Sequence, residues 1–133
     1  MAYILIVDSE AVFRQHLIHL IEQTGHRAIA VATIAEATRI LQQITPDMLA
    51  TDVVVADGSS AGLIRRVTRL GAQTLLMTRS PARMAEFDEA GQAYLQKPFL
   101  PQRFVQRVKD MLATVNPSSG KLMDGEARDQ KRL

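Results

Sequence analysis

The chain has 133 residues, of which 47% are hydrophobic, 23% charged and 5% aromatic, with a formal net charge of +2 and no cysteine. This length suits one globular domain with a substantial core, and the lack of cysteine excludes disulfides, thiol catalysis and cysteine-ligated metals. The small basic excess and the few aromatic residues argue against nucleic-acid binding. Because no apolar run is long enough for a membrane span and the first residues do not resemble a signal peptide, we expect a cytoplasmic protein that does not contact membrane.

Taken in chain order, the sequence predicts five strands, each followed by a helix. The strands are short apolar runs, a pattern typical of strands buried on both faces, and they lie at 3–7, 28–32, 52–56, 74–78 and 93–96. Four of the helices repeat apolar residues at helical spacing: Phe13, Leu17, Leu20 and Ile21; Ala37, Ile40, Leu41 and Ile44; Leu63, Ile64, Val67 and Leu70; and Phe104, Val108, Met111, Leu112 and Val115.

Local signals mark where the helices begin and end. The stretch "TIAE", residues 33–36, has the pattern of a capping box, in which Thr33 caps the second helix and Glu36 reaches back. Ser80 followed by Pro81 is a typical start for the fourth helix. Gly91 is well placed to end that helix.

The alternation of strands and helices predicts an α/β fold. Short connections between successive units favour a doubly wound, five-stranded parallel sheet of order 2-1-3-4-5, as in flavodoxin-like proteins. We predict one domain over residues 1–116. Residues 117–133 are rich in Ser, Gly and mixed charges, and they predict a flexible tail.

Four of the predicted strands end in polar residues, namely Asp8, Asp57, Thr78 and Lys97. In an open α/β sheet, ligands bind outside the carboxyl ends of the strands, where the strand order reverses. Two carboxylates brought together there repel each other and need a cation, and an oxygen-rich site suits Mg²⁺. A carboxylate, a metal, a lysine and a hydroxyl together favour phosphoryl transfer onto the carboxylate.

Each of these residues also has a simpler interpretation. Asp57 precedes Gly58, and Asp-Gly is a common turn signal. Asp8 is also a candidate cap for the first helix, and Lys97 a candidate solvent-exposed loop residue. The coincidence of all the polar strand ends favours a functional site over these alternatives.

The blocks "ILIVDSE", "VVVAD", "LLMT" and "AYLQKPF" resemble the signature blocks of response-regulator receiver domains, the phosphorylatable modules of two-component signalling, over about residues 3–115. The resemblance implies the same fold. It also implies the following roles: Asp57 as phospho-acceptor, Asp8 as a metal-site acid, Lys97 as the phosphate-pairing lysine, Thr78 and Tyr94 as switch residues, and a cis peptide at Lys97-Pro98.

The sequence departs from the family pattern at three places. Ser9 stands where the family has a second acid, so we expect Asp8 and Asp57 to bind Mg²⁺ weakly, with Ser9 as a further candidate ligand and Glu10 as a candidate that acts through water. The loop "DGSSAG" is shorter than usual and puts the expected metal-binding carbonyl near Ser59. Arg79 follows Thr78 where a small residue is usual, which makes it a modulator of phosphate access or binding.

The resemblance implies a non-enzymatic, single-domain response regulator. It would accept a phosphoryl group from a histidine kinase or histidine phosphotransferase and signal to a protein partner through helix four, strand five and helix five. The alternative is a degenerate receiver that binds partners without phosphorylation, and Ser9, the short loop and Arg79 motivate it. A flavodoxin-like nucleotide-binding protein or hydrolase is a third class, but "DSEAVF" after the first strand is no Gly-rich phosphate loop.

Overall fold

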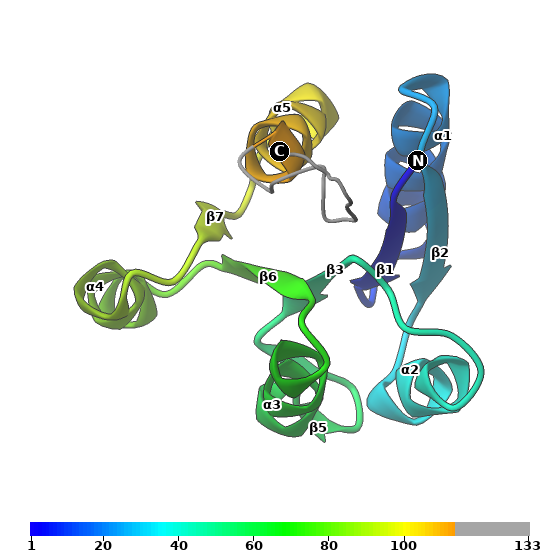
Figure 1. The fold of residues 1–133 in the computed structure, drawn as a ribbon. Helices are drawn as coiled ribbons and strands as arrows, with labels where there is room; N and C mark the ends of the chain where they lie inside the picture. The colour runs from blue at the N-terminus through cyan, green and yellow to red at the C-terminus, as the bar shows by residue number, and fades with distance from the viewer. Residues whose placement is uncertain (114–133) are drawn as a thin grey trace, which may run out of the picture.

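The computed structural model describes residues 1–113, which form a parallel sheet with helices on both faces (Figure 1). Five strands make up this sheet in the order β2-β1-β3-β6-β7. Their bounds are β1 Tyr3–Val7, β2 Arg27–Val31, β3 Met48–Asp52, β6 Gln73–Thr78 and β7 Tyr94–Gln96. The predicted doubly wound fold is therefore confirmed, with β6 and β7 as its fourth and fifth strands.

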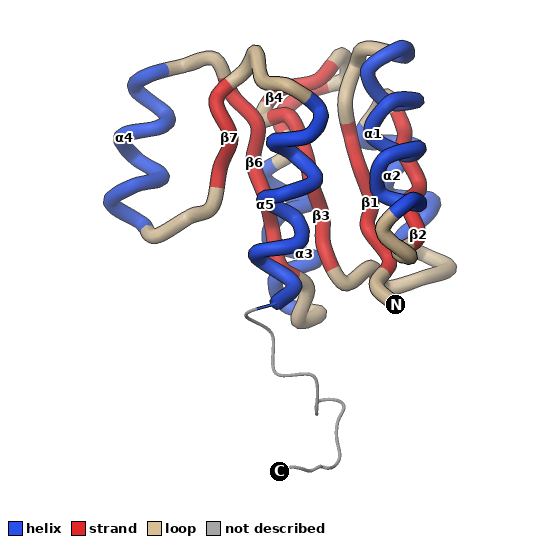
Figure 2. Tube along the Cα trace, turned by 90° about the horizontal axis from the view of Figure 1, so that it is seen from above, coloured by secondary structure: helices blue, strands red, loops and turns tan. Residues whose placement is uncertain are grey.

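The helices cover the sheet in two layers (Figure 1). Helices α1 and α5 lie on one face and α2 and α3 on the other, while α4 stands beyond the edge strand β7 (Figure 2). Their bounds are α1 Ala11–Gln23, α2 Ile34–Leu41, α3 Ala61–Arg69, α4 Pro81–Ala90 and α5 Pro101–Ala113.

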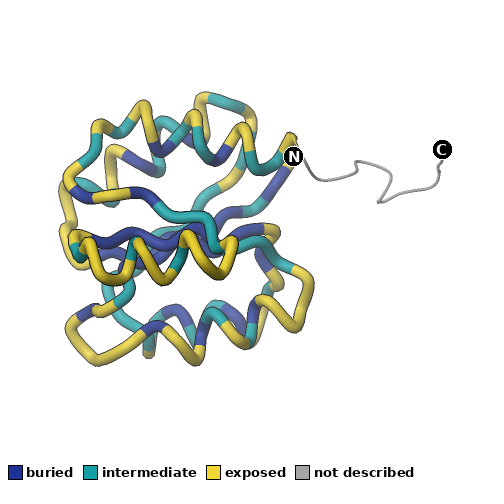
Figure 3. The backbone as a smooth tube through the Cα atoms, turned by 90° about the vertical axis from the view of Figure 1, so that its left-hand side faces the viewer, coloured by how far each residue is buried: buried dark blue, intermediate teal, exposed yellow. Residues whose placement is uncertain are grey.

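The sheet separates two hydrophobic clusters, because successive side chains of a strand point to opposite faces. In β1, Ile4 and Ile6 pack toward α1 and α5, whereas Leu5 and Val7 pack toward α2 and α3. Figure 3 shows the result as a buried middle layer between helices with exposed outer sides. The buried strands explain why the sequence reads as continuous apolar runs.

The predicted helix caps are confirmed. Thr33 Oγ1 accepts a hydrogen bond from the Glu36 N–H at 3.1 Å, and Glu36 reaches back to accept one from the Ala32 N–H at 3.0 Å. Ser80 caps α4 by accepting from the Arg83 N–H, and the helix ends at Gly91 in a left-handed conformation. Helix α2 ends at Leu41, one turn before the predicted Ile44.

The third strand lies earlier in the chain than predicted. It spans Met48–Asp52 rather than 52–56, and it pairs with β1 from Ile4↔Met48 to Val7↔Thr51. The valines that follow do not extend it: β4 Val54–Val55 and β5 Gly58–Ser59 form a separate two-stranded hairpin. The β-propensity of the valines favours 52–56, but the segment that forms the strand is the one that lies entirely in the core.

Some expectations fall at the end of the chain. The predicted domain end at residue 116, the tail at 117–133 and Val115 all lie outside the described residues. Among residues 1–113, no helix is both long and apolar enough to cross a membrane.

Candidate functional site

Three buried charged side chains meet at the carboxyl ends of the strands. Asp8 follows β1, Asp52 ends β3 and Lys97 follows β7. The Lys97 ammonium lies 2.7 Å from Asp8 Oδ2 and 2.8 Å from Asp52 Oδ1. One lysine therefore bridges two carboxylates, which the strand order brings together as expected at the point where it reverses.

Several contacts fix Lys97 in this position. The Lys97–Pro98 peptide is cis, as the family resemblance predicts. The Lys97 N–H donates to the Thr78 carbonyl at 2.8 Å, which continues the pairing of β6 with β7. The ammonium also lies 5.6 Å from the centre of the Phe13 ring, a cation–π distance. Its position therefore depends on β6, α1 and both acids.

Asp8 also orders the start of α1. Its Oδ1 accepts a hydrogen bond from the Glu10 N–H at 2.8 Å, and its backbone carbonyl accepts one from the Arg14 guanidinium. Asp8 therefore contacts the residue that precedes the helix, but it does not cap α1 as the alternative interpretation expected, because Glu10 is the N-cap residue.

The charges in this cluster do not balance, because two carboxylates share one ammonium. Burial raises the pKa of Asp52 above its usual range, and the negative charge of Asp8 adds to this, while the hydrogen bond from Lys97 opposes it. For Lys97, burial works to lower the pKa, but hydrogen bonds and charge interactions with Asp52 and Asp8 outweigh it and raise the pKa. The cluster thus holds a stable cation and an excess of negative charge.

A pocket of about 320 Å³ opens onto this cluster. Asp52 lines this pocket. So do five residues that the sequence predicted for the site, namely Ser9, Glu10, Thr78, Arg79 and Lys97. The Thr78 hydroxyl oxygen accepts a hydrogen bond from the Ser80 N–H at 3.0 Å. Carboxylate, ammonium, hydroxyl and guanidinium groups therefore border one space, which suits an anion held next to a nucleophilic carboxylate.

Asp57 is not part of this pocket, and its predicted place beside Asp8 and Lys97 is wrong. It lies in the turn of the β4–β5 hairpin, where Oδ1 accepts from the Ile34 N–H at 2.9 Å and Oδ2 from the Ala35 N–H at 3.0 Å. The expectation failed because it took "VVVA" as the end of the central strand. The turn interpretation of Asp-Gly applies instead, with an added contact to α2.

One further predicted position changes with this correction. Ser59 lies in β5 and does not line the pocket; its hydroxyl oxygen accepts from the Ala61 N–H. The metal-binding carbonyl was expected two residues after the acceptor aspartate. If Asp52 rather than Asp57 is that aspartate, the position is Val54, which does line the pocket. No group of three His, Asp or Glu side chains arranged to hold a metal occurs within residues 1–113.

Sequence reasoning missed Asp52 as a site residue, together with Val54 and Arg83 on the pocket wall. A signal for Asp52 was available. Pro46 and Asp47 end the second helical region, and the apolar residues directly after them begin a run that leads to Asp52.

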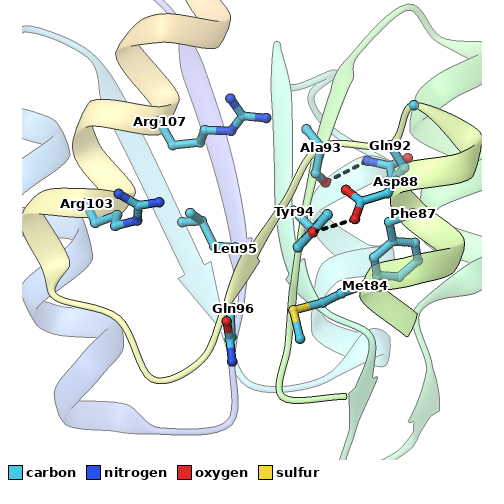
Figure 4. Close-up of a pocket in the computed structure, with 11 residues that line it drawn as sticks. Met84, Phe87, Asp88, Gln92, Ala93, Tyr94, Leu95, Gln96, Arg103 and Arg107 are labelled. Atoms are coloured by element: carbon cyan, nitrogen blue, oxygen red, sulfur yellow. Dashed lines mark hydrogen bonds between the residues drawn. The ribbon is translucent and has the colours of Figure 1, made fainter. Parts of the chain in front are cut away.

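A second, larger pocket of about 530 Å³ lies between α4 and α5 across β7 (Figure 4). Arg103 and Arg107 project from α5 on one side, and Met84 and Phe87 lie on α4 at the other. Tyr94, the predicted switch aromatic, lies in this groove rather than in the acidic pocket. Its hydroxyl donates to Asp88 Oδ2 at 3.1 Å, and this contact raises the pKa of Tyr94.

Comparison with known proteins matches residues 4–109 to the family model for the response regulator receiver domain. The phosphate regulon transcriptional regulatory protein PhoB of Escherichia coli is 25% identical over 121 residues, covering 86% of this chain and 53% of PhoB. The Klebsiella pneumoniae PhoB is 26% identical over the same length. The chain thus spans about half the length of these curated relatives.

Solved structures share the fold. A two-component response regulator from Clostridium difficile superimposes with a TM-score of 0.76 at 21% identity, covering 87% of this chain and 99% of that one. The signal receiver domain of a signal transduction histidine kinase from Syntrophus aciditrophicus gives a TM-score of 0.73 at 26% identity, covering 87% and 93%.

Proposed function

The chain belongs to the response-regulator receiver family, a family of signalling modules, and we propose that it accepts a phosphoryl group on Asp52 from a phosphohistidine partner. The observation that carries the proposal is the buried Asp8–Lys97–Asp52 cluster, in which Asp52 is the acid that lines the open pocket. Asp57, which the sequence indicated for this role, is engaged with α2 instead.

The proposed reaction is a simple displacement. A carboxylate oxygen of Asp52 attacks the phosphorus atom, an O–P bond forms, and the N–P bond to the partner's imidazole breaks. The imidazole leaves with the electron pair of that bond and takes a proton from solvent, while Asp52 becomes an acyl phosphate. In this proposal Lys97 and the Thr78 hydroxyl, which line the pocket, would interact with the phosphoryl oxygens, and Arg79 and Arg83 lie at the pocket wall.

The proposal includes a weakly bound Mg²⁺ as cofactor. The donors fit a hard cation, because Asp52 supplies carboxylate oxygens at the pocket and the buried Asp8 adds a second negative charge, so that the two acids together carry more charge than Lys97 neutralises. Ser9 offers a hydroxyl where the family has a further carboxylate, and Glu10 lines the pocket as a candidate water-mediated ligand. When bound, the ion would supply charge neutralisation for the transferring phosphoryl group.

The output partner is proposed to bind the groove between α4 and α5. Arginine side chains on α5 face apolar and aromatic groups on α4 (Figure 4), and such a mixture suits a protein segment with both apolar and acidic side chains. The kinase or phosphotransferase would instead approach the pocket at the strand ends, where Asp52 is reached. We place these encounters in the cytoplasm and expect no role for nucleic acid.

A second candidate function has two observations in its favour. Ser9 replaces an acid, and Lys97 already pairs with both remaining carboxylates. A receiver of this kind would bind its partner without being phosphorylated. It predicts that partner binding is unchanged when Asp52 is replaced.

Incubation with acetyl phosphate and Mg²⁺, followed by intact mass measurement, tests the proposal. Wild type and Asp57→Asn are expected to gain one phosphoryl group at the end point, while Asp52→Asn gains none. A canonical receiver labelled in parallel serves as the positive control. Labelling of Asp52→Asn but not Asp57→Asn would overturn the choice of acceptor, and an unlabelled wild type would favour the unphosphorylated module.

A further inference from the structure

The β4–β5 hairpin is attached to the rest of the molecule at its base. The buried Ser60 hydroxyl donates to the Asp52 carbonyl at 2.9 Å and the Val53 carbonyl at 3.1 Å. The Ser60 N–H also donates to the Val53 carbonyl at 2.9 Å. These bonds join the end of the hairpin to the residues that follow directly from the proposed acceptor.

The tip of the hairpin has a second attachment, through Asp57. Its two carboxylate oxygens accept from the Ile34 and Ala35 N–H groups, which are the first two of α2 and have no carbonyl partner inside the helix. These bonds lower the pKa of Asp57, so the side chain is anionic at neutral pH, where it also interacts favourably with the helix dipole.

Helix α2 has a cap of its own besides Asp57. Thr33 accepts the Glu36 N–H with its side chain and the Ala37 N–H with its carbonyl. The contact from Asp57 therefore adds something that a local cap does not, namely a connection between α2 and a hairpin that lies far away in the sequence.

The hairpin forms part of the pocket wall, because Val53 and Val54 line it. The Val54 side chain is 60% exposed, so packing does little to hold it, whereas Val55 belongs to the core cluster beneath α2 and α3. Polar anchors at both ends of the hairpin thus compensate for weak packing at the wall itself.

We propose that Asp57 is a positioning residue: by binding the N-terminus of α2, it holds the hairpin and with it the Val53–Val54 wall beside Asp52. This inference rests on the proposed function in one respect, that the pocket beside Asp52 binds Mg²⁺ and a phosphoryl group. The hairpin contacts themselves do not depend on it. It predicts that loss of the Asp57 contact loosens the wall and weakens Mg²⁺ binding, although Asp57 touches neither the pocket nor the ion.

Three variants test this proposal: Asp57→Ala, which removes both acceptor oxygens; Asp57→Asn, which keeps one; and Thr33→Ala, the matched control. The control removes a different cap of the same helix and leaves the hairpin contact in place. Amide hydrogen exchange of the hairpin is measured in metal-free protein by NMR, and the Kd for Mg²⁺ is measured by titration of the same spectra.

Faster exchange of the hairpin amides is expected in Asp57→Ala, with an intermediate effect in Asp57→Asn and none in Thr33→Ala. Outer positioning groups typically change metal affinity by about tenfold or more, so the Kd should rise about tenfold in Asp57→Ala. Equal effects of Asp57→Ala and Thr33→Ala, or an unchanged hairpin in Asp57→Ala, would overturn the proposal. If wild type binds no Mg²⁺, the proposed cofactor fails, and hydrogen exchange alone still decides the role of Asp57.

Discussion

At the scale of single residues, two aspartates five positions apart experience opposite environments. Asp52 is buried beside a second carboxylate, and burial raises its pKa. Asp57 is exposed and accepts two backbone N–H groups, which lower its pKa. Folding therefore disfavours the charge of Asp52 and favours the charge of Asp57.

These directions predict opposite effects on stability. The stabilising contribution of a group whose pKa is raised in the folded state is present below its unfolded pKa and is lost as pH rises through the folded value. At pH 7, Asp52→Asn should thus increase the free energy of unfolding, by on the order of 1 kcal/mol. This difference in the free energy of unfolding between Asp52→Asn and wild type should shrink as pH falls toward about 4, the ordinary aspartate pKa. Urea denaturation of both proteins at several pH values measures the difference.

Asp57→Asn is the matched comparison for this prediction. The contribution of Asp57 has the reverse sign, because its pKa is lowered in the folded state. Such a group stabilises the fold when the pH is above its unfolded pKa, and this stabilisation is lost as the pH falls through its folded pKa. Asp57→Asn should destabilise the protein at pH 7. Effects of the same sign for both substitutions at neutral pH would contradict the environments described for the two side chains.

At the scale of elements, α4 differs from the other helices. Each of α1, α2, α3 and α5 has two buried residues, while α4 has none. The helix still has strong local signals, with a Ser80 cap, Pro81 in the first turn and Gly91 at its end. Local signals thus define where α4 lies along the chain, but few tertiary contacts hold it.

We predict that α4 opens locally more often than the helices packed on the sheet. Free energies of local opening follow buried apolar contact, so α4 amides should exchange with solvent well before those of α1 and α5. Native-state hydrogen exchange by NMR resolves this. Protection of α4 amides equal to that of α5 would show that the helix is held more firmly than its burial indicates.

The sequence predicted elements best where local chemistry and burial agree. The Thr33–Glu36 cap and the run at 3–7 are examples, because the cap bonds join residues close together in the chain and the apolar run lies in a largely buried strand. The third strand failed because 48–52 and 52–56 both read as strands, and an aspartate follows or ends each one. Pro46 and Asp47 mark where the first of these runs can begin, but the pairing with β1 is what places it in the sheet, and that contact is not encoded locally.

The site was predictable to the extent that it depends on strand ends. Asp8, Thr78 and Lys97 were found because their strands were placed correctly. Asp52 was missed along with its strand. The contact of Asp57 with α2 joins segments 22 or more residues apart, so no spacing rule in the sequence points to it.

At the scale of the whole molecule, one sheet supports two cores. Phe104 and Val108 of α5 belong to the cluster on one face, and Leu63 and Val67 of α3 to the cluster on the other. Because β1 and the central strand β3 contribute side chains to both clusters, the two faces share the middle of the sheet. The described residues should therefore unfold as one cooperative unit.

Phe104→Ala tests this expectation. Phe104 is fully buried, and truncating such a ring costs about 3–5 kcal/mol through lost burial and the cavity left behind. Unfolding should remain a single transition, with probes on both faces losing structure together. Phe87→Ala on α4 is the control and should cost clearly less, because the Phe87 ring is only half-buried. Separate transitions for the two faces would contradict a shared core.

The lack of buried residues in α4 also bears on how this protein can diversify. Substitutions along a helix that contributes little to the core change stability little, so selection on folding leaves its sequence nearly free. Lys97, in contrast, is buried and pairs with both Asp8 and Asp52, so replacing it leaves two buried carboxylates without this counter-charge. The fold therefore combines a buried charged cluster in which substitutions are costly with a surface helix whose sequence folding constrains only weakly.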